Sequence, residues 1–180
     1  MSAKAPAKNL WSVPVRRDDV PETGLHLELV ADEATRAALA GVAGIRALPR
    51  LDASFDVVRQ GAGLRVTGEV AATVEQTCVV TLEPMTSELH EPIDLAFVPP
   101  SAGEPTDESA DDIDPGADDE TEVLVDGVAD LGATAAEFLL LAIDPYPRKP
   151  GAVFEAPKSD DPGAHPFAAL AALKKPPDKP

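Results

Sequence analysis

The chain has 180 residues, which is enough for one domain of ordinary size with further segments outside it. Its formal charge is −17, and 44% of its residues are apolar although only 4% are aromatic, so a core would consist mainly of Leu, Val, Ile and Ala. It contains no apolar run of about 18 residues and only one cysteine, Cys78. These features argue against a transmembrane helix and an internal disulfide, and they favour a cytoplasmic location.

Three elements are predicted in the N-terminal third, after a flexible tail of residues 1–9. Residues 10–17 form a short extended segment, in which Pro14 favours a place at a sheet edge. A half-buried strand is predicted where three leucines alternate with polar residues: Leu25, Leu27 and Leu29. Asp32 then suits the N-cap of a helix that continues to about Val42.

The strongest periodicity lies in residues 51–97, where apolar and polar residues alternate as in an antiparallel sheet with one face in water. The segment from Leu64 to Leu82 alternates for longer than the usual strand of about 5–6 residues. A bend or bulge is therefore predicted at Gly68 or Gln76. Two turns are predicted in this region: Gly61–Gly63 and Glu83–Met85.

Acidic residues concentrate between positions 101 and 122, which hold ten Asp or Glu and no Lys or Arg. Such a segment repels itself and has little to bury, so we predict a disordered acidic loop over residues 100–121. A last strand is predicted over residues 123–128, followed by a helix over residues 131–143 that Asp130 caps.

Together these elements predict an α+β fold. The expected architecture is a twisted, mainly antiparallel β-sheet, either open or partly closed into a barrel, with two or three packed helices. One domain is expected over residues 10–154, interrupted by the acidic loop. Residues 155–180 are expected to form a linker, a short helix over residues 166–174 and a disordered end.

No residue pattern for catalysis or for a bound cofactor emerges. The three histidines, His26, His90 and His165, fall on polar strand faces or in the predicted linker, and no Gly-x-Ser-x-Gly motif accompanies them. Gly61–Gly63 is not followed by the Lys-Ser/Thr of a phosphate-binding loop. The acidic loop lacks the spacing of an EF-hand, and Cys78 is expected to be a small core residue. We therefore predict no catalytic residue, no metal site and no cofactor.

Two short basic clusters interrupt this acidic chain: Arg16 and Arg17, and Arg148 and Lys149 beside Tyr146. Lys and Arg can neutralise phosphates and an exposed Tyr can stack on a base, so these five residues are the candidate RNA- or partner-binding residues. The alternative is that Tyr146 packs on the sheet and the cations are solvated.

The chain resembles the YceD family over roughly residues 10–175, and five blocks of the sequence carry the resemblance. The blocks are Cys78-Val-Val-Thr-Leu-Glu-Pro84, Asp126-Gly-Val-Ala-Asp-Leu-Gly132, Glu137-Phe-Leu-Leu-Leu141, Asp144-Pro-Tyr-Pro-Arg-Lys-Pro-Gly151 and His165-Pro-Phe-Ala-Ala-Leu-Ala-Ala-Leu-Lys174. The resemblance implies a role in the accumulation of 23S ribosomal RNA and of the large subunit, without a known catalytic residue. Many relatives have Cys-x-x-Cys before the Leu-Glu-Pro turn, whereas here Thr81 takes the second position, which argues against a metal or redox role.

The favoured hypothesis is a non-enzymatic, cytoplasmic factor that supports 23S rRNA accumulation and large-subunit biogenesis. Its partners would be large-subunit rRNA, or ribosomal and assembly proteins that meet the acidic loop, and the net charge favours the proteins. Neither a membrane nor a small-molecule cofactor is expected as a partner. Two alternatives are a small hydrolase that uses surface carboxylates and an acidic mimic of nucleic acid that binds a basic protein. The carboxylates considered for the hydrolase are Asp126, Asp130, Glu137 and Asp144.

Overall fold

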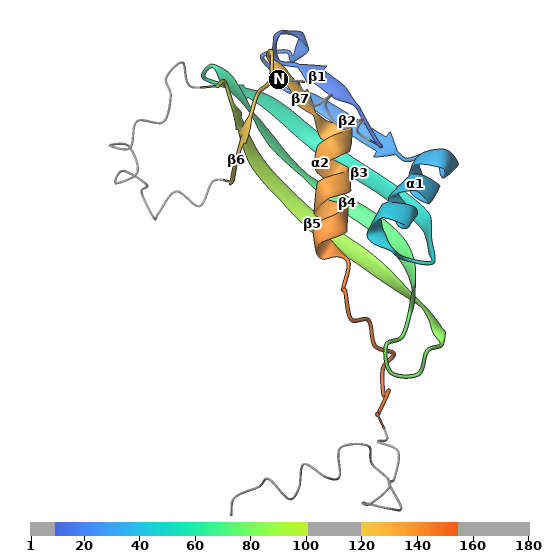
Figure 1. The fold of residues 1–180 in the computed structure, drawn as a ribbon. Coiled ribbons are helices and arrows are strands. Elements are labelled where there is room, and N and C mark those ends of the chain that lie inside the picture. Colours follow the sequence, from blue (N-terminus) through green and yellow to red (C-terminus); the bar gives the residue numbers. More distant parts are fainter. Residues whose placement is uncertain (1–9, 101–119, 155–180) are drawn as a thin grey trace, which may run out of the picture.

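A long antiparallel sheet crossed by one helix makes up most of the molecule (Figure 1). The computed structural model describes residues 10–100 and 120–154. The strands are β1 (Pro14–Arg16), β2 (Leu25–Val30), β3 (Ala47–Gln60), β4 (Gly63–Thr77), β5 (Pro84–Val98), β6 (Glu120–Val123) and β7 (Val128–Asp130). The helices are α1 (Glu33–Ala43) and α2 (Leu131–Ala142), and a 3-10 turn, η1, covers Arg17–Asp19. The predicted α+β class is confirmed.

Three predictions concern parts of the chain outside the described residues. They are the flexible tail over residues 1–9, the disorder of the acidic loop up to residue 119, and the linker, helix and end over residues 155–180. The last two residues assigned to the acidic loop are described, and both belong to β6.

The main sheet has the order β2-β3-β4-β5-β6, and all neighbouring strands are antiparallel except β5 and β6, which are parallel. A barrel would require a ladder between the two edge strands, but β2 and β6 do not pair, so the partly closed barrel is wrong. β1 and β7 form a separate two-stranded sheet.

The single strand predicted over residues 123–128 is wrong, because its two ends belong to two strands in different sheets. This stretch ends β6 at Val123, turns, and begins β7 at Val128, so that the chain leaves one sheet and enters the other.

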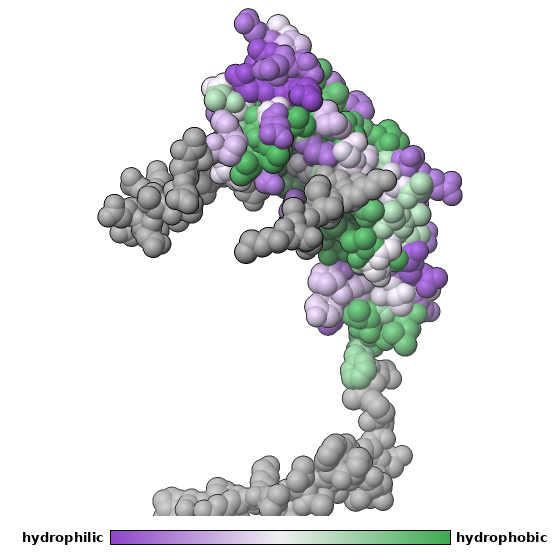
Figure 2. All heavy atoms as spheres, turned by 45° about the horizontal axis from the view of Figure 1, so that its top comes forward, coloured by the Kyte–Doolittle hydropathy of each residue, from purple (hydrophilic) through white to green (hydrophobic). Residues whose placement is uncertain are grey.

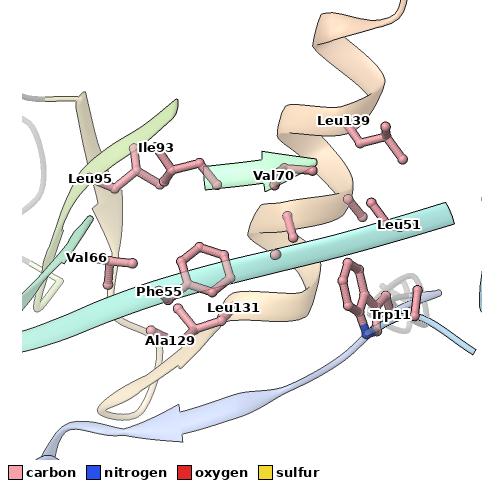
Figure 3. Packing of buried hydrophobic residues seen from close by; sticks show 14 of the residues in the cluster. Trp11, Leu51, Phe55, Val66, Val70, Ile93, Leu95, Ala129, Leu131 and Leu139 are labelled. Atoms are coloured by element: carbon pink, nitrogen blue, oxygen red, sulfur yellow. The ribbon is translucent and has the colours of Figure 1, made fainter. Parts of the chain in front are cut away.

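The hydrophobic core lies between the sheet and α2 (Figure 3). The apolar positions that alternate along β3 and β4 all point to this side: Leu51, Ala53, Phe55, Val57, Leu64, Val66, Val70, Ala72 and Val74 are buried. Leu131 and Leu139 of α2 pack onto them, and Trp11 joins the cluster from the N-terminal segment. Each large apolar side chain buried in this way contributes ~1.5–3 kcal/mol, so the alternation read from the sequence accounts for the main stabilising layer.

β4 is 15 residues long and keeps its register with both neighbours at Gly68 and with β5 at Gln76, so the predicted bulge in β4 is wrong. The register shift lies in β3, between Ala47 and Arg50. This interval contains Pro49, whose missing N–H cannot take part in a strand ladder, which explains why the irregularity falls there.

Gly68 allows β3 and β4 to approach each other closely. A Cβ atom at this position would lie 2.0 Å from the carbonyl oxygen of β3 that faces it, so the close approach of the strands requires glycine.

Both helices begin at an aspartate, as predicted, and neither helix of the described residues is long and apolar enough to cross a membrane. Asp32 caps α1 through a 2.7 Å hydrogen bond from a backbone N–H. Asp130 accepts a hydrogen bond from the Ala133 N–H (3.2 Å) at the start of α2. It also accepts from the Ser12 hydroxyl and the Val13 N–H, both at 2.8 Å. Asp130 therefore joins the first turn of α2 to the N-terminal segment.

Replacing Asp130 by Ala is expected to destabilise the protein more than replacing Asp32 by Ala. The Asp32 variant loses an N-cap, which typically costs ~1 kcal/mol. The Asp130 variant also leaves the Val13 N–H without its acceptor and loses the bond to Ser12, so we expect a loss of roughly 2–4 kcal/mol. Urea unfolding followed by circular dichroism measures both losses. Equal losses would contradict the role of Asp130 as a link between α2 and the N-terminal segment.

Candidate partner-binding surfaces

One end of the sheet is formed by the loop between β4 and β5, residues 78–83, and by the chain that follows α2. We call this loop together with residues 144–150 the tip. The Val79 N–H donates a hydrogen bond to the Pro147 carbonyl (2.9 Å), and Nε2 of Gln76 donates one to the Asp144 carbonyl (2.8 Å). Because Gln76 is buried, this bond satisfies an amide that would otherwise be costly to remove from water. The tip is thus a defined structure in which two distant segments are held together.

Cys78 lies where the two segments of the tip meet, and it is fully buried. Its Sγ accepts hydrogen bonds from the backbone N–H groups of Thr81 and Lys149, each at 3.4 Å. The hydroxyl and N–H of Thr81, followed by the N–H of Lys149, lower the pKa of the thiol to about 6 against the opposing effect of burial. The predicted burial of Cys78 is confirmed. Its role in joining residue 149 to the loop was missed, because nothing in the local strand pattern indicates a partner 71 positions away.

The lowered pKa of Cys78 is expected to make stability depend on pH. The folded-state pKa is about 6, whereas an unfolded thiol titrates near roughly 8.5. Between these values the unfolded chain retains a proton that the folded chain has released, so the contribution of the thiolate increases with pH and disappears as the pH falls through 6. We expect the free energy of unfolding of the wild type, minus that of Cys78→Ala, to increase from pH 5.5 to pH 9. Urea unfolding at a series of pH values measures this difference, and a constant value would rule out a thiolate at this position.

The tip presents Tyr146 and Arg148 to solvent. Tyr146 is 72% exposed, so the alternative in which its ring packs on the sheet is wrong. Nζ of Lys149 instead donates to Oε2 of Glu83 at 2.8 Å, and this contact lowers the pKa of the Glu83 carboxyl. Leu82 is also exposed, with a φ of 59° that is unfavourable for a residue other than glycine. Figure 2 shows apolar side chains at this end of the molecule, where the described chain leaves toward residue 155.

The second basic cluster, Arg16 and Arg17, lies at the other end of the sheet, beside the hairpin that joins β3 and β4. The Arg17 guanidinium donates to the Gly61 carbonyl (2.8 Å) and lies 3.4 Å from an Asp18 carboxylate oxygen, whereas Arg16 is exposed. The 15 residues of β4 span the distance between this hairpin and the tip, which is roughly 45 Å at the rise of a strand. The five predicted binding residues therefore form two separate groups.

The face of the sheet that points away from α2 carries a dense set of charges, and we call it the open face. The pairing of β2 to β5 places seven carboxylates on it: Glu28, Asp52, Asp56, Glu69, Glu75, Glu88 and Asp94. Only two arginines lie among them: Arg65 is 2.7 Å from Asp94, and Arg50 is 3.4 Å from Asp52. Sequence reasoning missed this surface because it attributed the negative charge to the acidic loop. These carboxylates could have been found in the sequence, because they occupy the polar positions that alternate with the core residues of the strands.

Two histidines lie on the open face, and both are exposed, as predicted. His26 sits between Asp56, at 2.8 Å, and Glu28, at 3.0 Å, and hydrogen bonds to these two carboxylates raise the pKa of the imidazole. His90 lies further along the same face, on β5. His165 is outside the described residues. The raised pKa means that His26 stays protonated up to a higher pH than an ordinary histidine, and the protonated ring neutralises part of the surface.

Three of the four carboxylates of the hydrolase hypothesis are spread along α2 and do not converge, and the fourth, Asp126, lies in the turn between β6 and β7. Asp130 caps α2, Glu137 lies two turns further along the helix, and Asp144 follows its end. Successive members of this series are roughly 10 Å apart at the rise of an α-helix. The Asp144 carboxylate accepts the Tyr146 N–H at 2.8 Å. Among the described residues, no group of three or more His, Cys, Asp or Glu side chains could hold a metal ion.

Comparison with protein families relates this arrangement to a known group. The model of the family described as "Large ribosomal RNA subunit accumulation protein YceD" matches residues 66–174, which is more than half of the chain. The match includes most of β4 and all of β5, both segments of the tip and α2. Comparison with curated proteins and with solved structures finds no match. The chain belongs to the YceD family of large ribosomal RNA subunit accumulation proteins.

Proposed function

We propose that this protein is a non-enzymatic, cytoplasmic factor that supports 23S rRNA accumulation and large-subunit biogenesis by binding a basic ribosomal or assembly protein through its open face. The family description supports the connection with the large-subunit RNA. The open face supports the mode of action. Its seven carboxylates are the observation on which the proposal depends.

The open face suits a basic partner because its charges are held by a sheet. Neighbouring strands lie ~4.8 Å apart and side chains on one face repeat every second residue, so the carboxylates form a fixed array. The negative charge of the open face accelerates its encounter with a cationic surface and disfavours binding to an anionic surface. A fixed array of negative charges can also imitate the phosphates of a nucleic acid. The acidic-mimic alternative is therefore a variant of the same proposal, in which the basic protein is one that otherwise binds RNA.

Within residues 10–100 and 120–154, the two basic clusters considered for direct RNA binding are the tip and the pair Arg16 and Arg17. Both cationic groups are small, and within them Arg17 and Lys149 already contact carboxylates. Tyr146 and Arg148 remain exposed and provide one stacking ring and one cation. The formal charge of −17 opposes the approach of a polyanion. The tip is therefore the secondary candidate, for a contact made after a protein partner has docked.

The two modes can be separated by mixing the full-length chain with 23S rRNA fragments or with purified basic large-subunit proteins, at about 50 and 300 mM salt. We expect capture of one or more of the proteins, weakening as salt screens the charges, and no capture of the RNA alone. RNA binding that Tyr146→Ala and Arg148→Ala abolish would contradict the proposal and assign the tip as the primary surface. Absence of protein binding at both salt concentrations would also contradict it.

A further inference from the structure

An apolar groove of about 370 Å³ runs along the side of α2, away from the open face. It lies between α2, α1 and the start of the described chain. Its lining includes Leu10, Trp11, Leu39, Ala136, Leu140 and Leu141. Leu10 is 45% exposed and Leu141 is 77% exposed, so the groove presents large apolar side chains to water. Contiguous apolar surface of this kind usually marks a place where another segment binds.

The sequence of α2 reinforces this interpretation. Leu131, Ala135 and Leu139 face the sheet and are buried, as expected for the inner side of a helix. The outer side contains Leu140 and Leu141, and its only charged residue is Glu137. A helix that is apolar on all sides is typically covered on all sides. In the described residues the sheet and the N-terminal segment cover α2, and Leu39 of α1 adjoins it, but Leu140 and Leu141 on its outer side stay exposed, so part of its surface lacks a partner.

We propose that the groove binds the C-terminal segment of the same chain, residues 166–174, through Phe167, Leu170 and Leu173. These three side chains recur every three residues and would lie on one side of a helix. The segment contains no acidic residue, and Lys174 and Lys175 at its end complement Glu137 on the rim of the groove. The match to the family model extends to residue 174, so it ends where this apolar segment ends.

The chain is long enough for this contact. Eleven residues separate Phe154, the last described residue, from Pro166, and an extended linker of that length reaches roughly 40 Å. α2 has 12 residues, a length of about 18 Å. The tip begins two residues after α2 ends, so the linker can return from the tip along the helix to the groove.

Disulfide trapping in the full-length chain tests the proposal. Leu141→Cys with Leu170→Cys places one thiol at the groove and one in the segment, while the native Cys78 remains buried. The matched control is Val30→Cys with Leu170→Cys, because Val30 is an exposed residue of β2 on the open face and lies nearer the tip than the β3–β4 hairpin does. We expect an intramolecular disulfide in the groove pair to form at least roughly tenfold faster than in the control pair, because docking raises the effective concentration of the thiols.

Three outcomes decide the matter. Adding Phe167→Ala and Leu173→Ala to the groove pair should reduce its rate to that of the control, and an unchanged rate would overturn the assignment of the contacts. Equal rates for the groove and control pairs would overturn the docking itself. Disulfide-linked dimers in place of closed monomers would show that a second copy occupies the groove, which also contradicts the proposal.

Discussion

Replacing Gly68 by Ala is expected to cost at least roughly 3 kcal/mol of stability, the upper part of the range for inserting a methyl group into a packed interior. The added Cβ would lie 2.0 Å from the Ser54 carbonyl oxygen and 3.0 Å from Cδ1 of Phe55. Neither neighbour can move easily, because Ser54 belongs to the ladder between β3 and β4 and Phe55 is fully buried in the core. Thermal or urea unfolding of the purified variant measures the loss.

The control for this variant is Gly41→Ala in α1. A Cβ there has no atom within 4 Å, and alanine favours a helix over glycine by ~1 kcal/mol. The control should therefore be as stable as the wild type or more stable. If Gly68→Ala were also neutral, the two strands would not approach each other as closely as the structure indicates.

Neutralising the centre of the open face should have the largest effect on function. We expect Glu28→Gln, Glu69→Gln and Glu88→Gln together to weaken binding to a basic partner by roughly ten- to a hundredfold at low salt, with most of the difference lost at high salt. All three side chains are exposed and polar, so the fold should tolerate the change. Titration of the captured ribosomal or assembly protein with each variant measures the affinity.

A variant with the same change in charge at other places provides the control. Glu22, Glu33 and Glu122 are exposed, and none of them belongs to the open face. Their replacement by Gln should reduce affinity much less than the triple change on the open face. Equal reductions would mean that net charge alone drives binding and that the arrangement of carboxylates on the sheet is irrelevant.

The sequence predicted the parts of the fold that depend on neighbouring residues. Alternation identified the buried side of β3 and β4, and Asp32 and Asp130 were recognised as caps, because these signals lie within a few positions of one another. The pairing of β1 with β7 was not predicted, since no local pattern links residues separated by more than 100 positions. The same limit concealed the contact between Cys78 and Lys149.

Candidate surfaces were predicted less well than the fold. The composition showed a strongly negative chain, but counting charges along the sequence does not reveal which of them share a face. Combining the polar positions of β2 to β5 with an antiparallel register would have revealed the open face. The basic residues were identified individually, yet their separation into two groups depends on the length of β4 and on the position of the hairpin.

The link between the N-terminal segment and the start of α2 also has a consequence for biosynthesis. Ser12 and Val13 bind Asp130, and the separation of Ser12 from Asp130 is 118 residues. A nascent chain emerging from the ribosome at ~5–20 residues per second must therefore wait roughly 6–24 s before its first strand can find its partner. During that interval Val15 lacks its β7 neighbour Ala129 and Trp11 lacks α2, so the unfinished polypeptide exposes two apolar side chains that the complete chain buries.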